Sequence, residues 1–281
     1  GMDVVTYTGN GGTQSISSLA FQPDLVWIKA RSATYNHYLV DQVRGFNGSN
    51  AKVLQSNLTN AEESQNGPGN AFVSFDNDGF TVELGTNNWA GTNQNNQTYV
   101  AWCWKAGGAA VSNTDGTLTS QVSASDEYGF SVVKWTGQSS GSATVGHGLS
   151  TAPKWIIVKG LTGTVGWTVG HESIGWTKRL QLNTTAAEST SSNYWNDTAP
   201  TSSVFTSGAN NINNTFVAYC WSEVSGFSKF GSYSGTGSAV TVTTGFKPQY
   251  ILVKSTSSGR DWLIWDAARG ASSGALQSNS S

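Results

Sequence analysis

The sequence predicts an all-β protein made of tandem antiparallel β-sandwich modules, and three observations lead to this prediction. The first is an internal repeat in three copies. The second is a series of short segments rich in Val, Ile, Thr, Tyr and Trp, which favour strands and are separated here by Gly, Asn and Ser. The third is that no window keeps a helical period for three turns. About eight such segments in about 100 residues are typical of a β-sandwich.

The three copies align without gaps over a stretch that begins at a proline. Proline has no N–H to donate to a sheet, so it is typical of the position just before a strand. Each proline is followed at constant spacing by a lysine, an aromatic or histidine residue, an acidic or histidine residue, and a glycine. Alignment at so many positions indicates a true tandem repeat. The aligned residues, in copy order, are Pro23, Pro153 and Pro248; Lys29, Lys159 and Lys254; His37, Trp167 and Trp262; Asp41, His171 and Asp266; and Gly45, Gly175 and Gly270.

The repeat predicts two full modules and about half of a third. We expect module 1 over residues 2–109, a polar connector over 110–127, module 2 over 128–225, and a partial module 3 over 226–281 that holds the N-terminal half of the repeat. Either the natural polypeptide continues or the half-module packs on another surface, and we favour a fragment. Self-association through module 3 is one way to order it. We expect each module to bury one sheet face by itself, as one unit of an extended array.

Composition excludes several classes of function. Only 11% of residues are Asp, Glu, Lys or Arg, against about 25% in an average globular chain. The net charge is −2 and there is no basic block, so we expect no nucleic-acid partner. No apolar run approaches the roughly 20 residues of a membrane span, so we expect no membrane partner. Twelve Trp, nine Tyr and eleven Phe predict well-filled cores beneath a neutral, hydrogen-bonding surface.

The cysteines and histidines are predicted to be structural. Cys103 and Cys220 occupy the same repeat position in separate modules, so we expect two buried thiols rather than a disulfide. The histidines fall at three different repeat positions, which does not suit a metal cluster. Because Trp replaces His37 in the other copies, a packing role is predicted for it. His171 is expected at a polar strand end, and His147 just before a strand.

Carboxylates that recur in the repeat are the alternative source of chemistry. Asp41 matches Asp266, and Glu62 matches Glu188, and such residues could form a glycosidase pair. A catalytic site need not be repeated, however, whereas a folding signature is. We therefore predict that the recurring carboxylates cap turns through backbone N–H groups. The prediction is no enzyme, with no catalytic residue, no cofactor and no metal site; "FDNDGF" at residues 75–80 is predicted to be a tight hairpin turn.

Two tryptophans in Asn-rich loops are the candidate binding residues. Trp89 lies in "TNNWAGTNQNN" and Trp195 in "SNYWND". An exposed indole stacks on a pyranose ring while nearby amides bind the hydroxyls, so both are candidates for glycan contact. The alternative is that each indole folds down over an edge of its sandwich.

Three long motifs resemble a repeat module of the virion and tail-fibre-like proteins of tailed bacteriophages, especially marine ones. They are "NTDGTLTSQVSASDEYGFSVVKWTGQSSGSATVGHGLSTAPKWIIVKG", "LNTTAAESTSSNYWNDTAPTSSVF" and "TFVAYCWSEVSGFSKFGSYSGTGS". The resemblance covers nearly the whole chain. It implies a fold similar to the concanavalin A-like jelly roll, and it carries over no catalytic residue. Module 1 lacks the "GHGL" and "YWND" pieces.

The function expected from the residues and the resemblance together is that of a non-enzymatic virion structural protein. It would be a tail-fibre or appendage segment involved in host-surface recognition, made in the host cytoplasm and located in the phage particle. Its expected partners are other virion subunits, a second copy of itself, and host surface glycan. The alternative is a carbohydrate-binding or glycan-cleaving module on the same sandwich, and a groove with paired carboxylates would favour cleavage.

Overall fold

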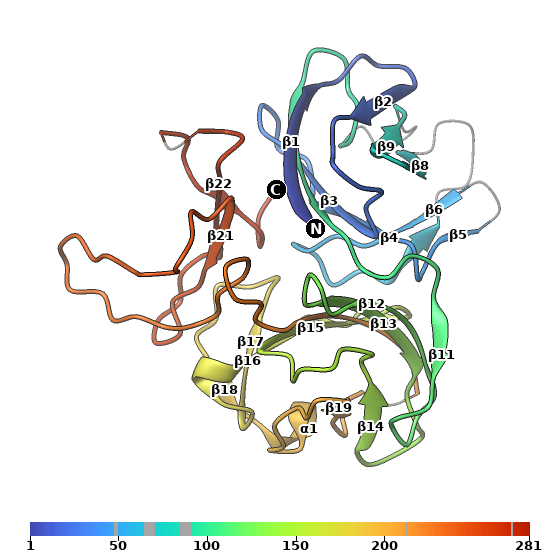
Figure 1. Cartoon of the computed structure of the whole chain (residues 1–281), viewed down its shortest axis with the longest axis vertical. Coiled ribbons are helices and arrows are strands. Elements are labelled where there is room, and N and C mark those ends of the chain that lie inside the picture. Colours follow the sequence, from blue (N-terminus) through green and yellow to red (C-terminus); the bar gives the residue numbers. More distant parts are fainter. Residues whose placement is uncertain (48–49, 65–70, 85–90, 212, 271) are drawn as a thin grey trace.

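The computed structural model describes residues 1–281 except 48–49, 65–70, 85–90, 212 and 271. The regular secondary structure of the described chain is almost entirely antiparallel β-sheet, with one four-residue helix, α1 (Ser192–Trp195), and a 3₁₀ turn at Glu172–Ile174. The predicted all-β sandwich class is thereby confirmed (Figure 1). The finer expectation of a concanavalin A-like jelly roll stays a prediction.

Module 1 is a sandwich of a four-stranded and a three-stranded sheet. Every second residue of β10 faces the other sheet, and Tyr99, Ala101 and Cys103 meet Phe72 and Phe80 there in a buried core. The four-stranded sheet has the order β1 (Met2–Thr8), β10 (Thr98–Trp104), β3 (Leu25–Ala30), β4 (Tyr38–Asp41). The other has the order β2 (Gln14–Ser17), β9 (Gly79–Val82), β8 (Phe72–Asp76), and a small sheet joins β5 (Phe46–Asn47), β6 (Asn50–Val53) and β7 (Glu63–Ser64).

Module 2 repeats this plan with a wider sheet. The residues expected to form a separate connector supply two of its strands, because Val122 of β12 pairs with β13 and is buried in the module's own core. The eight-stranded sheet has the order β11 (Val111–Asn113), β12 (Ser120–Ser125), β13 (Phe130–Thr136), β20 (Thr215–Trp221), β15 (Trp155–Gly160), β16 (Trp167–His171), β17 (Lys178–Gln181), β18 (Ser189–Thr190). Opposite it lie β14 (Ala143–Gly146) and β19 (Val204–Ser207).

Module 3 is a single three-stranded sheet of β21 (Tyr250–Val253), β22 (Leu263–Asp266) and β23 (Leu276–Gln277). Residues 222–249, which lead into it, contain no strand. The aligned glycines of all three copies have positive φ, 62° at Gly45, 76° at Gly175 and 88° at Gly270. Glycine adopts positive φ without a steric penalty, which accounts for a glycine at this position in each copy.

The main sheets are buried on both faces, which differs from the expected extended array. Val100, Trp102 and Trp104 alternate with the module 1 core residues of β10 and enter a second core. Val217, Tyr219 and Trp221 of β20 enter this same core, as do Trp262 and Ile264 of module 3. The three modules therefore surround one shared core, and Figure 1 shows them grouped around a common centre. The strands β10 and β20 carry apolar residues at nearly every position because both of their faces are covered.

The same contact joins each module to the previous one. In every case a ring nitrogen at the aligned aromatic or histidine position meets the backbone carbonyl of the glutamine in an aligned "LQ" pair. The contacts are Trp167 Nε1 to Gln55 O (3.0 Å), Trp262 Nε1 to Gln181 O (2.9 Å) and His37 Nε2 to Gln277 O (2.8 Å). They run from module 2 to 1, from 3 to 2 and from 1 to 3, so the three repeats close a ring around the shared core.

Recurring aspartates reinforce the ring. Asp41 Oδ1 accepts the backbone N–H of Arg44 at 2.8 Å, which is the turn cap that the repeat predicts, and Asp266 does the same for Arg269 at 3.0 Å. The second oxygen of each carboxylate binds the arginine Nε and also a donor from another module. For Asp41 that donor is Tyr219 Oη of module 2 (2.8 Å), and for Asp266 it is Trp102 Nε1 of module 1 (3.0 Å).

Candidate functional site

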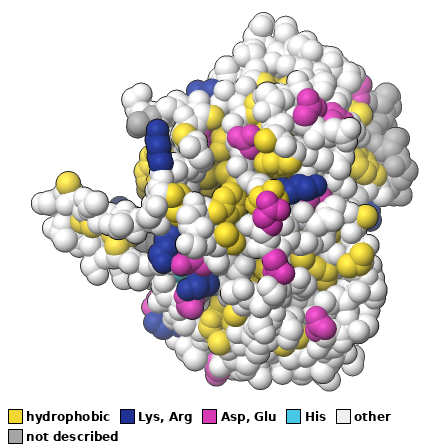
Figure 2. Space-filling model, in the orientation of Figure 1, with side chains coloured by type: hydrophobic (Ala, Val, Ile, Leu, Met, Phe, Trp, Pro, Cys, Tyr) yellow, Lys and Arg dark blue, Asp and Glu magenta, His cyan; other side chains and the backbone are white. Residues whose placement is uncertain are grey.

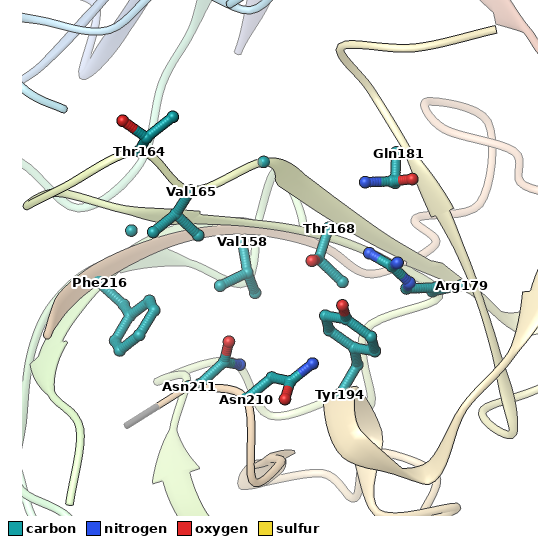
Figure 3. Close-up of a pocket in the computed structure, with 12 residues that line it drawn as sticks. Val158, Thr164, Val165, Thr168, Arg179, Gln181, Tyr194, Asn210, Asn211 and Phe216 are labelled. Atoms are coloured by element: carbon teal, nitrogen blue, oxygen red, sulfur yellow. The ribbon is translucent and has the colours of Figure 1, made fainter. Parts of the chain in front are cut away.

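A polar cleft in module 2 is the candidate binding site. It lies between the main sheet, represented by β15, β16 and β17, and the segment that runs from α1 to the loop before β20. Its volume is about 240 Å³. This is below the roughly 300–1,000 Å³ of sites for drug-sized molecules, so it suits one small ring or chain end. The side chains that define its polar character are Thr168, Arg179, Gln181, Tyr194, Asn210 and Asn211 (Figure 3).

Arg179 and Tyr194 form the charged end of the cleft. The Arg179 guanidinium carbon lies 3.9 Å from the centroid of the Tyr194 ring, a cation–π contact between β17 and α1. The Arg179 Nε is buried and has no hydrogen-bond partner within the described chain. A buried donor without a partner is costly.

Amide groups lie across the cleft from the sheet that carries Arg179 and Thr168. Figure 3 shows Asn210 and Asn211 on one side and Thr168 on the sheet opposite, with their polar atoms directed toward the same space. Asn211 and Thr168 are each 6% exposed, so both are held in place by packing. Phe216 and Val158 supply the apolar part of the lining. A cation, a phenol, amides and a hydroxyl in one small cavity match a ligand with several hydroxyl groups or a carboxylate.

Two residues that line the cleft have no counterpart in module 1. The position of Arg179 in the "RLQ" of module 2 is held by Val53 in module 1 and Ala275 in module 3. Tyr194 stands in the "YWND" piece that module 1 lacks. The substitution of arginine at a repeat position otherwise held by small apolar residues was the sequence signal for this site. Without the fold, that position is indistinguishable from any other strand residue, so the signal is weak.

Of the two predicted glycan-contacting tryptophans, Trp195 is described by the structure and does not line this cleft. Trp89 lies outside the described residues. Trp195 is 1% exposed, and its ring packs edge-to-face on Trp176 with centroids 5.3 Å apart. The prediction of an exposed stacking surface at Trp195 is therefore wrong, and the indole folds over the sandwich edge instead. The single turn of α1 turns Trp195 inward and leaves the neighbouring Tyr194 at the cleft.

The histidines have the structural surroundings that their repeat positions predict. His37 is buried, and its Nδ1 accepts the Trp27 Nε1–H at 2.8 Å, so its Nε2 carries the proton that is donated to Gln277. Burial and the nearby Lys29 lower its pKa to about 3. The His147 ring bonds the Thr201 carbonyl, and His171 accepts the N–H of Ser173 at the end of β16.

The thiols and the predicted hairpin also agree with the sequence. Cys103 and Cys220 are buried free cysteines, and burial raises the pKa of both. In "FDNDGF", Asp76 pairs with Gly79 across a two-residue turn. Within the described residues, no group of three or more His, Cys, Asp and Glu side chains could hold a metal ion. None of the described helices is long and apolar enough to cross a membrane.

The surface is poor in charge on the face of the molecule that is drawn in Figure 2. Figure 2 shows acidic and basic side chains scattered singly or in small groups over a surface of mostly uncharged residues. Ion pairs outside the core, such as Lys154–Glu172 at 2.9 Å, are partly exposed and contribute little to stability. A surface of this kind offers hydrogen bonds and stacking rather than a strong electrostatic field.

Comparison with known proteins gives a family. Residues 2–281 match the family described as "Domain of unknown function (DUF7483)", so the chain belongs to that family over nearly its whole length. No curated protein and no solved structure matches it significantly.

Proposed function

We propose that this member of the DUF7483 family is a non-enzymatic structural and recognition protein that binds a host surface glycan through the module 2 cleft. The observation that carries the proposal is the cleft itself, where Arg179, Tyr194 and Asn211 surround about 240 Å³ of polar space. A sugar hydroxyl or carboxylate would accept from Arg179, and its ring hydroxyls would bind the asparagine amides.

The placement in a tailed-phage particle, as part of a tail fibre or appendage, rests on the sequence resemblance. Two features support a structural role. The shared core and the three joints give a rigid body, and the charge-poor surface limits non-specific adhesion. A rigid scaffold that carries a polar cleft suits recognition at a cell surface. Other virion subunits remain the proposed structural partners.

A glycan array with the purified chain tests the proposal. We expect binding of hydroxyl-rich or acidic glycans, and we expect Arg179→Ala to weaken it at least about 10-fold, as for a residue that contributes strongly to an interface. Tyr194→Ala should weaken it as well, because the tyrosine ring holds the guanidinium in place. Lys178→Ala is the matched control, since Lys178 is the neighbouring basic residue on β17 and pairs with Glu188 instead.

Two results would count against glycan recognition. One is silence of the folded wild-type chain across the array, which would leave a purely structural role. The other is binding that Arg179→Ala and Lys178→Ala reduce equally, which would place the binding surface elsewhere. Release of shortened glycan products by the wild-type chain would instead support the glycan-cleaving alternative.

A further inference from the structure

The segments of module 3 that form no strand are those that match strands with a pairing partner later in the repeat. In module 2, β13 pairs with β20 and β14 pairs with β19. The module 3 segments that match β13 and β14, at about 227–234 and 239–242, form no strand. By contrast, β21, β22 and β23 pair with one another and do form. Module 3 thus has strands only where their pairing partners are present among the described residues.

The consequence is an open edge on β21. The matching strands β3 and β15 each pair over six residues with β10 and β20, respectively, and are buried along their whole length. In the described structure β21 pairs with β22 alone, and its residues are half-buried or exposed. Ile251 is 42% exposed, whereas Val26 and Ile156 at the same repeat position are fully buried at 0%.

Exposed apolar side chains also occur in the segments of module 3 that lack a pairing strand. The large hydrophobic residues exposed in the described chain include Tyr233 (54%), Val240 (41%) and Val242 (53%), all in the segments that lack a pairing strand. Residues 231–243 are exposed throughout, and the orange loop after β20 extends away from the rest of the molecule in Figure 1. An unpaired strand edge is a template for strand addition, and exposed apolar residues in the same module are typical of a surface that binds a partner.

We propose that the open edge of β21 binds an extended strand with the sequence pattern of β10 and β20, supplied by a further copy of this repeat. The pattern is Thr, aromatic, Val, Ala, aromatic, Cys, Trp, as in "TYVAWCW" and "TFVAYCW". The backbone of such a strand would complete the ladder, as in other strand-addition complexes. Its alternate side chains would cover Ile251 on one face and extend the shared core on the other.

The modules themselves identify this occupant. Both complete copies place a strand of this pattern antiparallel to the strand that matches β21, in a fixed register: Trp155 pairs with Trp221, and Leu25 with Trp104. On its other side the added strand would meet the segment that contains Tyr233, as β20 meets β13. An arbitrary peptide would offer neither the aromatic spacing nor the small Ala that these pairings use. The inference does not depend on glycan binding.

Hydrogen exchange in the 281-residue chain tests the proposal. A synthetic peptide of residues 199–222, which contains β19 and β20, is added to the chain in excess. Amide exchange at Tyr250–Val253 is expected to slow at least about 10-fold, because paired strand amides open far less often than free ones. A peptide of the same composition in scrambled order should have no effect.

A surface variant and a fusion complete the test. Ile251→Asp should abolish the slowing, since it puts a charge where the added strand would bury Ile251. Val111→Asp, at another exposed apolar residue (65%) on β11, should not. The fusion adds a second copy of residues 186–225 directly after Ser281. Because Ser281 matches Thr185 in the repeat, this continues module 3 in register. Exchange of the same amides should slow in the fusion without added peptide. Unchanged exchange in both the peptide mixture and the fusion would refute the proposal, as would equal slowing in Ile251→Asp.

Discussion

Buried lysines are the clearest sign, at the scale of single residues, that the repeats fold against one another. Lys159 is fully buried, and its ammonium group donates to the carbonyl of Gly160 at 2.7 Å and lies 3.5 Å from the carbonyl of Thr59 in module 1. Lys254 makes the matching contact with Thr185 of module 2 at 3.1 Å. Burial, with a smaller effect of Arg44, lowers the pKa of Lys159 to about 8.

This shift predicts how stability depends on pH. The usual lysine pKa of 10.5 applies to the unfolded chain, so between about pH 8 and 10.5 the unfolded state binds more protons than the folded state. Stability contributed by Lys159 therefore rises with pH through that window and is constant below it. Urea unfolding of the wild type and of Lys159→Met should be measured at about pH 7 and about pH 10. The free energy of unfolding of the wild type should rise relative to that of the variant between the two pH values.

The exposed Lys247 provides the control for that measurement. Lys247→Met removes an amine without removing a buried charge. The difference in free energy of unfolding between the wild type and this variant should therefore be the same at both pH values. A wild type that loses stability relative to Lys159→Met on going to high pH would contradict the prediction.

At the scale of elements, the joint between modules 1 and 3 differs from the other two. In module 1 the buried His37 accepts from Trp27, whereas the same two repeat positions hold Trp167 and Ile157 in module 2. In module 1 the larger side chain is on β3 and the smaller ring precedes β4. In module 2 the smaller side chain is on β15 and the larger ring is on β16. Together, the two side chains fill the joint to a similar extent in both modules.

Exchanging the pair tests this. His37→Trp alone should destabilise the chain by about 2 kcal/mol or more, because it overfills a packed site and leaves the Trp27 N–H without an acceptor. Adding Trp27→Ile installs the module 2 pair and should recover at least half of the loss, a coupling typical of residues in contact. Denaturant unfolding of both single variants and the double variant measures it. Strictly additive effects would show that the two positions are independent.

The strands were predictable from the sequence, but their surroundings were not. Proline followed by a β-branched and aromatic run located β3, β15 and β21. The unbroken apolar runs of β10 and β20 already indicated two covered faces, yet we expected one buried face per module. The joints use backbone carbonyls, such as that of Gln55 for Trp167, and no side-chain pattern marks an acceptor of that kind.

The candidate site was the less predictable part. Asn-rich sequence around Trp195 pointed to the right loop, but the turn of α1 buries that indole and leaves Tyr194 at the cleft. Rotation within one helical turn decides which of two adjacent aromatic residues is accessible, and composition does not report it. Arg179 was visible as a departure from the repeat, although its meaning depends on what the fold places opposite.

At the scale of the whole molecule, the shared core couples the modules. Trp104 of module 1 is 6% exposed and packs edge-to-face on Trp221 of module 2, with ring centroids 6.0 Å apart. The core includes residues from all three modules. Modules that share buried area of this kind unfold together rather than one by one, unlike the units of an extended repeat array.

Calorimetry checks this coupling. Modules 1 and 2 should melt in one transition, and Trp104→Ala should lower the midpoint of that transition for both. The free energy of unfolding should fall by about 3–5 kcal/mol, as for other buried aromatic residues. Tyr233→Ala, at a residue 54% exposed, is the control and should have little effect. Separate transitions, or a shift confined to module 1, would show that the modules are independent.

The closed ring also bears on how the protein could arise. Three separate chains of one repeat, joined through the same ring-nitrogen to carbonyl contact, would form a cyclic homotrimer with three identical surfaces. Fusion of the copies into one polypeptide removes that constraint, since each copy can then change by itself. His37 in one copy, and Arg179 with its cleft in another, are changes that a true trimer would have had to accept three times over.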